Sequence, residues 1–331
     1  MGIRRIAYLD IVKLVTIYLV ILGHVLIKMD PDLSVGGKLY AFIYTFHMPL
    51  FVLLSGYFAG SSLTKSFSTF VWTKARQLLL PVVPCTIIAC IYLFLFRHQL
   101  NFRDEIIGNS WFLKILFVYY VLFYLLKQIK VNDWMLFVTS AALLFFIPMG
   151  SSLQMNLLYP YFWCGYFMRK YNVLEKLCAG HYLLLVVMVF VGLYVCKLEY
   201  GIPTYIPINK DTLFGYWHLI AFRYLIGFVG CLMVIMLVSL LYNGFYKSEG
   251  QSCLAEYGKK TLGVYVLQTI LVINVFPDVY QWNVESEFML DVVFAPIISV
   301  CFLSVCLWLI SVLSRSRILD LLFFGGQYYR R

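Results

Sequence analysis

Charged side chains are scarce in this sequence. Of 331 residues, 13% are charged and 62% are hydrophobic, whereas soluble domains carry about 25% charged residues. A single water-soluble core of this size cannot absorb such an apolar excess. Apolar runs near the length of about 20 residues that spans a bilayer recur along the chain. They use most of it and leave no room for a separate soluble domain.

Closely paired cysteines are also missing, and we expect no cleavable leader. Several of the nine cysteines lie in apolar runs without the spacing of metal or redox motifs, so we expect buried, inert thiols and no metal site: Cys85, Cys90, Cys164, Cys231, Cys301 and Cys306. The first apolar run starts near Tyr8, and Leu22-Gly23-His24 offers no persuasive cleavage site. We expect this run to remain as the first helix.

The apolar runs predict an all-α membrane bundle of about ten transmembrane helices, forming one domain over residues 1–331. The expected spans lie near 8–28, 38–59, 78–96, 111–127, 134–149, 157–168, 181–197, 217–242, 261–276 and 291–313. Several are shorter than a full crossing, so the middle pairs are expected to be tilted or partly re-entrant.

The formal charge of +10 is arranged as a topology signal rather than as a nucleic-acid surface. Cytoplasmic loops collect Lys and Arg, and 17 of the 26 basic residues fall at one set of helix ends: Arg4, Arg5, Lys65, Lys74, Arg76, Lys127, Lys130, Arg169, Lys170, Lys176, Lys247, Lys259, Lys260, Arg315, Arg317, Arg330 and Arg331. Most acidic residues fall at the other ends. Both termini are therefore predicted to be cytoplasmic, with the protein crossing the membrane many times.

The first helix carries three ionisable residues, Asp10, Lys13 and His24. Each costs roughly 2.5–3.5 kcal/mol in a bilayer unless it has a partner, water or a function. At about 100° per residue, Lys13 and His24 differ by some 20° around the helix and Asp10 lies within about 60° of both. One reading is a polar path about 16 Å long. The other is an interfacial Asp10–Lys13 ion pair with His24 capping the outer end.

His47 lies inside the second apolar run, two residues before Pro49. A proline releases a backbone carbonyl and kinks a helix, which membrane helices tolerate beside neighbours or water. Neutral imidazole can take a proton from a hydroxyl, the basic requirement of acyl transfer to an alcohol. His47 is therefore a candidate catalytic residue alongside His24.

Three further residues have two readings each. Lys74 and Arg76 precede the third span, where they either anchor the topology or bind phosphates. Trp111 opens the fourth span, where it is either part of an ordinary aromatic belt or a functional residue.

These residues carry a resemblance to a known family. Asp10-x-x-Lys13 followed by His24, then Phe46-His47-Met48-Pro49-Leu50-Phe51 and Ser55-Gly56-Tyr57, resemble the membrane-bound acyltransferase-3 family, in its branch of sugar O-acetyltransferases related to fucose 4-O-acetylase. Lys74 to Arg76, Trp111-Phe112-Leu113 and Gly258 to Tyr265 support it. The chain departs from the family at Lys13 (commonly Arg), Gln77 (commonly basic) and Gln268 (commonly His).

The resemblance implies a bacterial inner-membrane O-acetyltransferase with no bound cofactor, using acetyl-CoA or another acyl-CoA as co-substrate and a glycan or lipid-linked sugar as acceptor. His24 and His47 would be catalytic, with His24 as general base, and Asp10, Lys13 and Gln268 would support them. Lys74, Arg76 and Trp111 would bind the donor. No Gly-rich phosphate loop or serine elbow favours a covalent intermediate, so direct transfer is preferred, with an acyl-histidine left open. A transporter or flippase for a lipid-linked sugar or small solute is the alternative.

Overall fold

The computed structural model of this protein describes residues 7–30, 37–98, 102–108, 110–146, 154–179, 181–204, 208, 212, 215–245, 253–280 and 286–329. Every regular element in these ranges is helical, and they contain no strand. The prediction of an all-α membrane protein is confirmed. The basic residues Arg4, Arg5, Lys247, Arg330 and Arg331 lie outside the described residues.

Among the residues that the structure describes, seven helices are long and apolar enough to cross a membrane. They coincide with seven of the predicted spans: α1 (Ala7–Met29); α3 (Lys38–Ala59) with its 3-10 turn η1 (Gly60–Ser62); α4 (Phe67–Lys74), η2 (Ala75–Leu79) and α5 (Val82–Arg97); α7 (Trp111–Gln128); α13 (Trp217–Phe245); α15 (Thr261–Gln268), η3 (Thr269–Val275) and α16 (Phe276–Val279); and α17 (Glu287–Met289), η4 (Leu290–Phe294) and α18 (Ala295–Leu313).

The three remaining predicted spans correspond to shorter helices. α8 (Asp133–Leu144), α9 (Met155–Lys170) and α11 (Leu183–Glu199) have 12, 16 and 17 residues. At 1.5 Å per residue, α8 is about 18 Å long, well below a hydrocarbon thickness of about 30 Å. The total of ten crossings and the cytoplasmic termini therefore stay predictions. The other short helices among the described residues are α6 (Phe102–Gly108), α10 (Val173–Ala179), α14 (Cys253–Gly258) and α19 (Arg317–Phe324).

Three of the long helices contain a π-helical stretch, and a proline follows each stretch by two residues. η2 ends before Pro81, η3 before Pro277 and η4 before Pro296. Proline has no N–H, and its ring clashes with the carbonyl four residues earlier, which here lies inside the π stretch. A widened turn relieves this clash without ending the helix.

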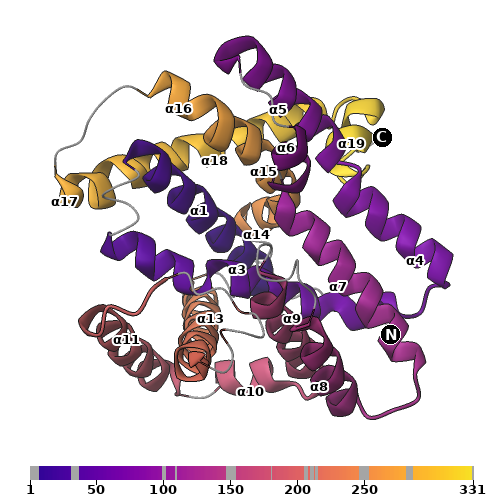
Figure 1. Cartoon of the computed structure of the whole chain (residues 1–331), viewed down its shortest axis with the longest axis vertical. Coiled ribbons are helices and arrows are strands. Elements are labelled where there is room, and N and C mark those ends of the chain that lie inside the picture. Colours follow the sequence, from indigo (N-terminus) through magenta and orange to yellow (C-terminus); the bar gives the residue numbers. More distant parts are fainter. Residues whose placement is uncertain are drawn as a thin grey trace. The chain divides into compact units, whose positions relative to one another are not determined.

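The chain divides into two compact units. The first comprises residues 1–12, 44–67 and 118–255. In it α8 packs on α9 and α11 packs on α13, as Figure 1 shows. Its core is aromatic: the Phe123 ring centroid lies 5.2 Å from that of Trp163 and 5.6 Å from that of Phe162.

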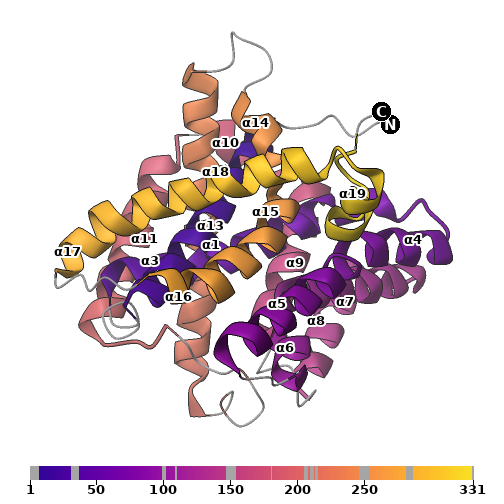
Figure 2. The same cartoon turned by 90° about the horizontal axis from the view of Figure 1, so that it is seen from above.

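The second unit comprises residues 13–43, 68–117 and 256–331. Here α15 packs on α18, α5 packs on η3, and α19 lies beside α5 (Figure 2). The Cys85 thiol on α5 donates to the Val266 carbonyl on α15 at 3.9 Å. Arg97 at the end of α5 pairs with Asp278 on α16 at 3.1 Å and donates to the Asn274 carbonyl at 2.9 Å.

The cysteines are only partly as predicted. All nine are free, and Cys85, Cys90, Cys231 and Cys306 are buried. The prediction of burial is wrong for Cys301, which is exposed, and for Cys164, which is half-buried. Cys301 lies on α18, which exposes Ile297, Val300 and Val305 as well. An apolar run does not say which face of its helix meets protein and which faces outward.

Candidate functional site

Three of the predicted site residues lie on one uninterrupted helix, α1. Asp10 is buried, with 3% of its surface exposed, and Lys13 and His24 are half-buried. Over the eleven residues from Lys13 to His24 the helix rises about 16 Å. The boundary between the two units falls after Val12, so Asp10 belongs to the first unit and Lys13 and His24 belong to the second.

His47 lies in the part of α3 that belongs to the first unit. Its side chain is buried, and its ring meets the Tyr44 ring edge-on with centroids 4.6 Å apart. Pro49 follows inside the same helix, which continues to Ala59. The role of His47 as a catalytic residue stays a prediction.

Gln268 is the last residue of α15, and its side chain is completely buried. Its Nε2 donates to the Thr269 hydroxyl at 3.2 Å. No group in the described part of the chain hydrogen-bonds to its Oε1. A buried acceptor left unpaired costs about 1–3 kcal/mol. A donor group on a ligand would remove that cost.

Gln268 is followed at once by the π-helical stretch η3, a type of element that is frequent at functional sites. Two polar residues of η3 are buried, Thr269 and Asn274. Thr269 donates to the Tyr265 carbonyl at 2.9 Å, and Asn274 donates to the Thr269 carbonyl at 3.4 Å. Neither residue was predicted from the sequence, although a polar side chain within an apolar run is a signal that could have indicated it.

Trp111 begins α7, and aromatic contacts connect it to the helix that carries Gln268. Its ring centroid lies 6.2 Å from that of Phe112, and the Phe112 ring lies 5.6 Å from the Tyr265 ring. Tyr265 precedes Gln268 by three residues, close to one turn of α15. The second unit therefore brings Trp111 and Gln268 into one neighbourhood through two aromatic rings.

Lys74 ends α4, and Arg76 lies in the π-helical stretch η2. Two glycines near the end of the described chain pack against Arg76. Gly325 and Gly326 have φ angles of +66° and +74°, which disfavour any other residue. A Cβ on Gly325 would overlap the Arg76 carbonyl oxygen, and one on Gly326 would overlap its guanidinium. The proximity of these glycines to Arg76 was not predicted from the sequence.

The same C-terminal segment is tied to α15. The Gly263 amide donates to the Tyr328 hydroxyl at 3.2 Å, and the Tyr328 amide donates to Asp320 at 3.1 Å. Burial raises the pKa of the Tyr328 hydroxyl. The segment after α18 thus packs against the elements that carry Gln268 and Arg76.

An ion cluster in the first unit surrounds Asp133, which is 7% exposed. Its carboxylate accepts hydrogen bonds from Lys127, from Lys170 at 2.6 Å and from the Tyr166 hydroxyl at 2.9 Å. Burial alone would raise the pKa of Asp133, but these hydrogen bonds outweigh burial and lower it to about 2. Lys127 and Lys170, expected only as topology signals, therefore also have a structural partner.

Within the described residues, no group of three or more His, Cys, Asp or Glu side chains could hold a metal ion. The polar residues of the second unit instead offer two amines, a guanidinium, an imidazole and an amide: Lys13, Lys74, Arg76, His24 and Gln268. Cations favour an anionic ligand, and an imidazole can exchange a proton near neutral pH.

Comparison with known proteins gives the family. The acyltransferase domain matches residues 6–313. The chain belongs to the acyltransferase-3 family. The match extends over nearly the whole chain and across all the candidate residues, from Asp10 to Gln268. The resemblance noted from Asp10, Lys13, His24 and His47 is thereby confirmed at the level of the family.

Two relatives of this acyltransferase-3 chain are nodulation proteins NolL. The one from Mesorhizobium japonicum is 30% identical over 211 residues, which cover 59% of this chain and 57% of the relative. The one from Sinorhizobium fredii is 32% identical over 211 residues, which cover 59% and 58%. The chain therefore matches little more than half the length of these relatives. No solved structure matches it.

Proposed function

We propose that this protein is a membrane O-acyltransferase of the bacterial inner membrane. It transfers an acetyl group, or another short acyl group, from cytoplasmic acyl-CoA to a hydroxyl of a cell-surface glycan or its lipid-linked precursor. The acyltransferase match over residues 6–313 carries the proposal. CoA enters as a co-substrate, and the protein needs no bound cofactor.

His24 is the proposed general base. Its neutral imidazole takes the proton of the acceptor hydroxyl as the oxygen attacks the thioester carbonyl carbon. The carbon–sulfur bond then breaks, and the departing CoA thiolate takes the proton back from the imidazolium. This sequence forms one ester bond, breaks one thioester bond and leaves His24 neutral.

The donor is proposed to bind at the basic residues of the second unit. CoA carries several phosphate groups, and Lys13, Lys74 and Arg76 supply positive charge for charge-assisted hydrogen bonds. The guanidinium of Arg76 packs against Gly326, which restricts its orientation. Trp111 offers an aromatic face close to α15.

Gln268 is proposed to accept a hydrogen bond from the acceptor sugar. Its buried Oε1 has no partner in the described chain, and a sugar hydroxyl is a donor of suitable size. Where the family commonly has histidine, Gln268 would then select the acceptor rather than exchange a proton. His47 is kept as a separate candidate for orienting a reactant or stabilising an oxyanion, and Asp10 as a partner for Lys13.

Purified protein in liposomes, supplied with labelled acetyl-CoA and candidate glycans, tests the proposal. Wild type should form a labelled acetyl ester on the glycan, and His24→Ala should lose about 10²–10⁴-fold of that rate while accumulating normally. His181→Ala is the matched control, because His181 is exposed outside the helices. Full activity of His24→Ala would exclude the general-base role.

The same liposomes separate an enzyme from a transporter. A transporter or flippase would move a lipid-linked sugar without acetyl-CoA and without forming an ester. Mass spectrometry of surface glycans from cells with and without the gene would then identify the acceptor and the acyl group.

A further inference from the structure

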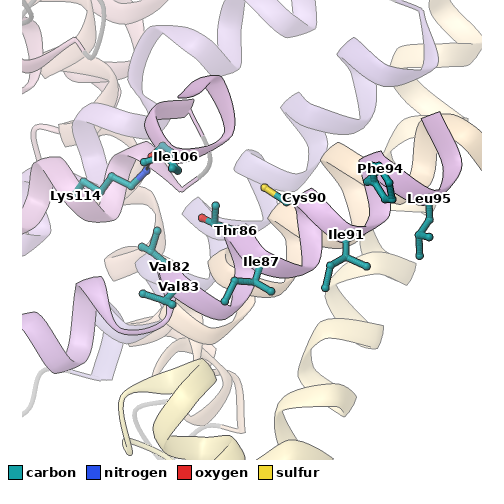
Figure 3. Close-up of a pocket in the computed structure, with 10 residues that line it drawn as sticks. All are labelled: Val82, Val83, Thr86, Ile87, Cys90, Ile91, Phe94, Leu95, Ile106 and Lys114. Atoms are coloured by element: carbon teal, nitrogen blue, oxygen red, sulfur yellow. Dashed lines mark hydrogen bonds between the residues drawn. The ribbon is translucent and has the colours of Figure 1, made fainter. Parts of the chain in front are cut away.

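A cavity of about 700 Å³ lies in the second unit, along one side of α5 (Figure 3). Its lining is apolar except at Thr86 and Lys114: Val82, Val83, Thr86, Ile87, Cys90, Ile91, Phe94, Leu95, Ile106 and Lys114. The volume is within the range of about 300–1,000 Å³ found for small-molecule sites. No residue assigned to the proposed chemistry lines it.

The cavity lies on the outward side of α5. Cys85 and Ala89 are completely buried, with Cys85 bonded to α15, while Ile87 and Ile91 are each 53% exposed. Because residues four apart lie above one another on a helix, Val83, Ile87, Ile91 and Leu95 form one continuous apolar stripe. Since Phe67–Arg97 is long and apolar enough to cross a membrane, we expect this stripe to face hydrocarbon. A ligand entering here comes from the lipid phase.

One cation stands at the wall of the cavity. The Lys114 ammonium donates to the Ile106 carbonyl and to the Ile107 carbonyl at 3.3 Å, close to the C-terminal end of α6. These bonds hold the ammonium in place beside Ile106, as Figure 3 shows. An anionic headgroup is therefore favoured at this end, and a hydrocarbon chain is favoured along the stripe.

The cavity is linked to both proposed substrate regions of the second unit. Lys114 follows Trp111 by three residues, close to one turn of α7. On its other side, α5 reaches α15 two residues before Gln268, through Cys85 and Val266. An acetyl donor has only two carbons to transfer and needs no long hydrocarbon chamber. The chamber therefore suits the other substrate.

We propose that this cavity binds the hydrocarbon chain of a lipid-linked acceptor, a sugar joined through phosphate to a long polyprenyl chain, with the phosphate at Lys114. The inference rests on the proposed acyl transfer and narrows the acceptor class to a lipid-linked precursor. Lipid tails are as apolar as leucine, so the chain gains little by leaving the bilayer. Selectivity over bulk lipid comes from the charged end.

Native mass spectrometry of the full-length protein, delipidated in detergent and given a polyprenyl phosphate, tests binding independently of catalysis. Wild type should retain polyprenyl phosphate at least tenfold better than phosphatidylglycerol, neutral polyprenol or palmitoyl-CoA. Ile87→Trp, which fills the cavity, should abolish that preference. Ile297→Trp is the matched control, because Ile297 is a 59% exposed isoleucine on α18 outside the cavity.

Two further variants keep the test decisive. Ile91→Trp replaces Ile87→Trp if the latter does not accumulate. Lys114→Met should reduce retention of polyprenyl phosphate to that of neutral polyprenol. If wild type retains phosphatidylglycerol as well as polyprenyl phosphate, the cavity is a general lipid surface. If wild type prefers palmitoyl-CoA, the cavity binds the chain of the donor. If both tryptophan variants bind polyprenyl phosphate as well as wild type does, the lipid binds elsewhere. Each result overturns the proposal.

Catalysis then separates this proposal from the proposed function. With a lipid-linked acceptor, Ile87→Trp should raise the KM at least tenfold, while a short-chain soluble analogue is acetylated as by wild type. If both acceptors are acetylated equally well by the variant, the cavity proposal fails and acyl transfer stands. If wild type acetylates neither, acyl transfer fails, and the mass spectra still decide whether the cavity binds the lipid.

Discussion

The backbone of Phe162 occupies the space that a side chain on Gly56 would need. A Cβ on Gly56 would overlap the Phe162 carbonyl oxygen and would stand 2.9 Å from the Phe162 Cα. Gly165, on the next turn of α9, is equally close to α3, because a Cβ there would stand 2.8 Å from the Tyr57 amide nitrogen. Small residues allow membrane helices to approach this closely. The crossing of α3 and α9 thus depends on one glycine from each helix.

Gly56→Ala should destabilise the protein by about 3 kcal/mol or more, because backbone atoms rather than a flexible side chain block the new methyl group. The measurement is the thermal unfolding midpoint in detergent. Gly192→Ala is the control, since Gly192 also lies in a helix but has open space around it. There alanine should stabilise by up to about 1 kcal/mol. Equal midpoints for the two variants would contradict this packing.

Gln268→Leu should raise the KM for the acceptor about tenfold, the value of one hydrogen bond of roughly 1.4 kcal/mol. The KM for acyl-CoA should not change. Stability should hold or improve, because the variant removes a buried acceptor that has no partner in the described chain. Steady-state kinetics with each substrate varied in turn provide the measurement. A lowered melting temperature with both KM values unchanged would assign Gln268 a purely structural role.

The Asp133 cluster predicts a loss of stability in acid. The pKa of Asp133 lies below its ordinary value of 3.8, at about 2, so the folded state favours the carboxylate. Its contribution is complete above pH 4 and disappears as the pH falls toward 2. Because Lys170 is partly exposed, we expect the cluster to contribute about 1–2 kcal/mol to the free energy of unfolding.

Unfolding midpoints from pH 7 to pH 2 measure this contribution. Asp133→Asn should lower stability at pH 7 and flatten the decline between pH 4 and pH 2. Glu175→Gln is the comparison, because Glu175 is 59% exposed and lies 3.9 Å from Arg169. If the unfolding midpoint of Asp133→Asn falls between pH 4 and pH 2 as much as that of wild type, other groups cause the acid sensitivity.

Gly326→Ala should weaken donor binding by displacing Arg76, whose guanidinium occupies the space of the new methyl group. We expect the KM for acyl-CoA to rise about three- to tenfold, while the KM for the acceptor is unchanged. Gly201→Ala separates strain from displacement, because Gly201 also has a positive φ, +57°, but nothing lies within 4 Å of it. A similar rise in both variants would mean that backbone strain alone is responsible.

Several local features could be predicted from sequence because each depends on residues close together in the chain. Hydropathy predicted the helices, and an uninterrupted apolar run placed Asp10, Lys13 and His24 on α1. The motif around His47 indicated the family. The π-helical stretches were not predicted, although each is followed by a proline that could have indicated an irregular turn.

What the sequence alone determined is an all-α membrane protein of the acyltransferase-3 family with basic residues at alternate helix ends. Only the tertiary structure decided that Gly56 meets Phe162, that Gly326 meets Arg76, and that Gln268 is buried with an oxygen unpaired among the described residues. The physical reason is the separation along the chain of the residues that interact. Helix formation follows from neighbouring residues, but these contacts join positions some 100 to 250 residues apart, and apolar helices look alike on every face.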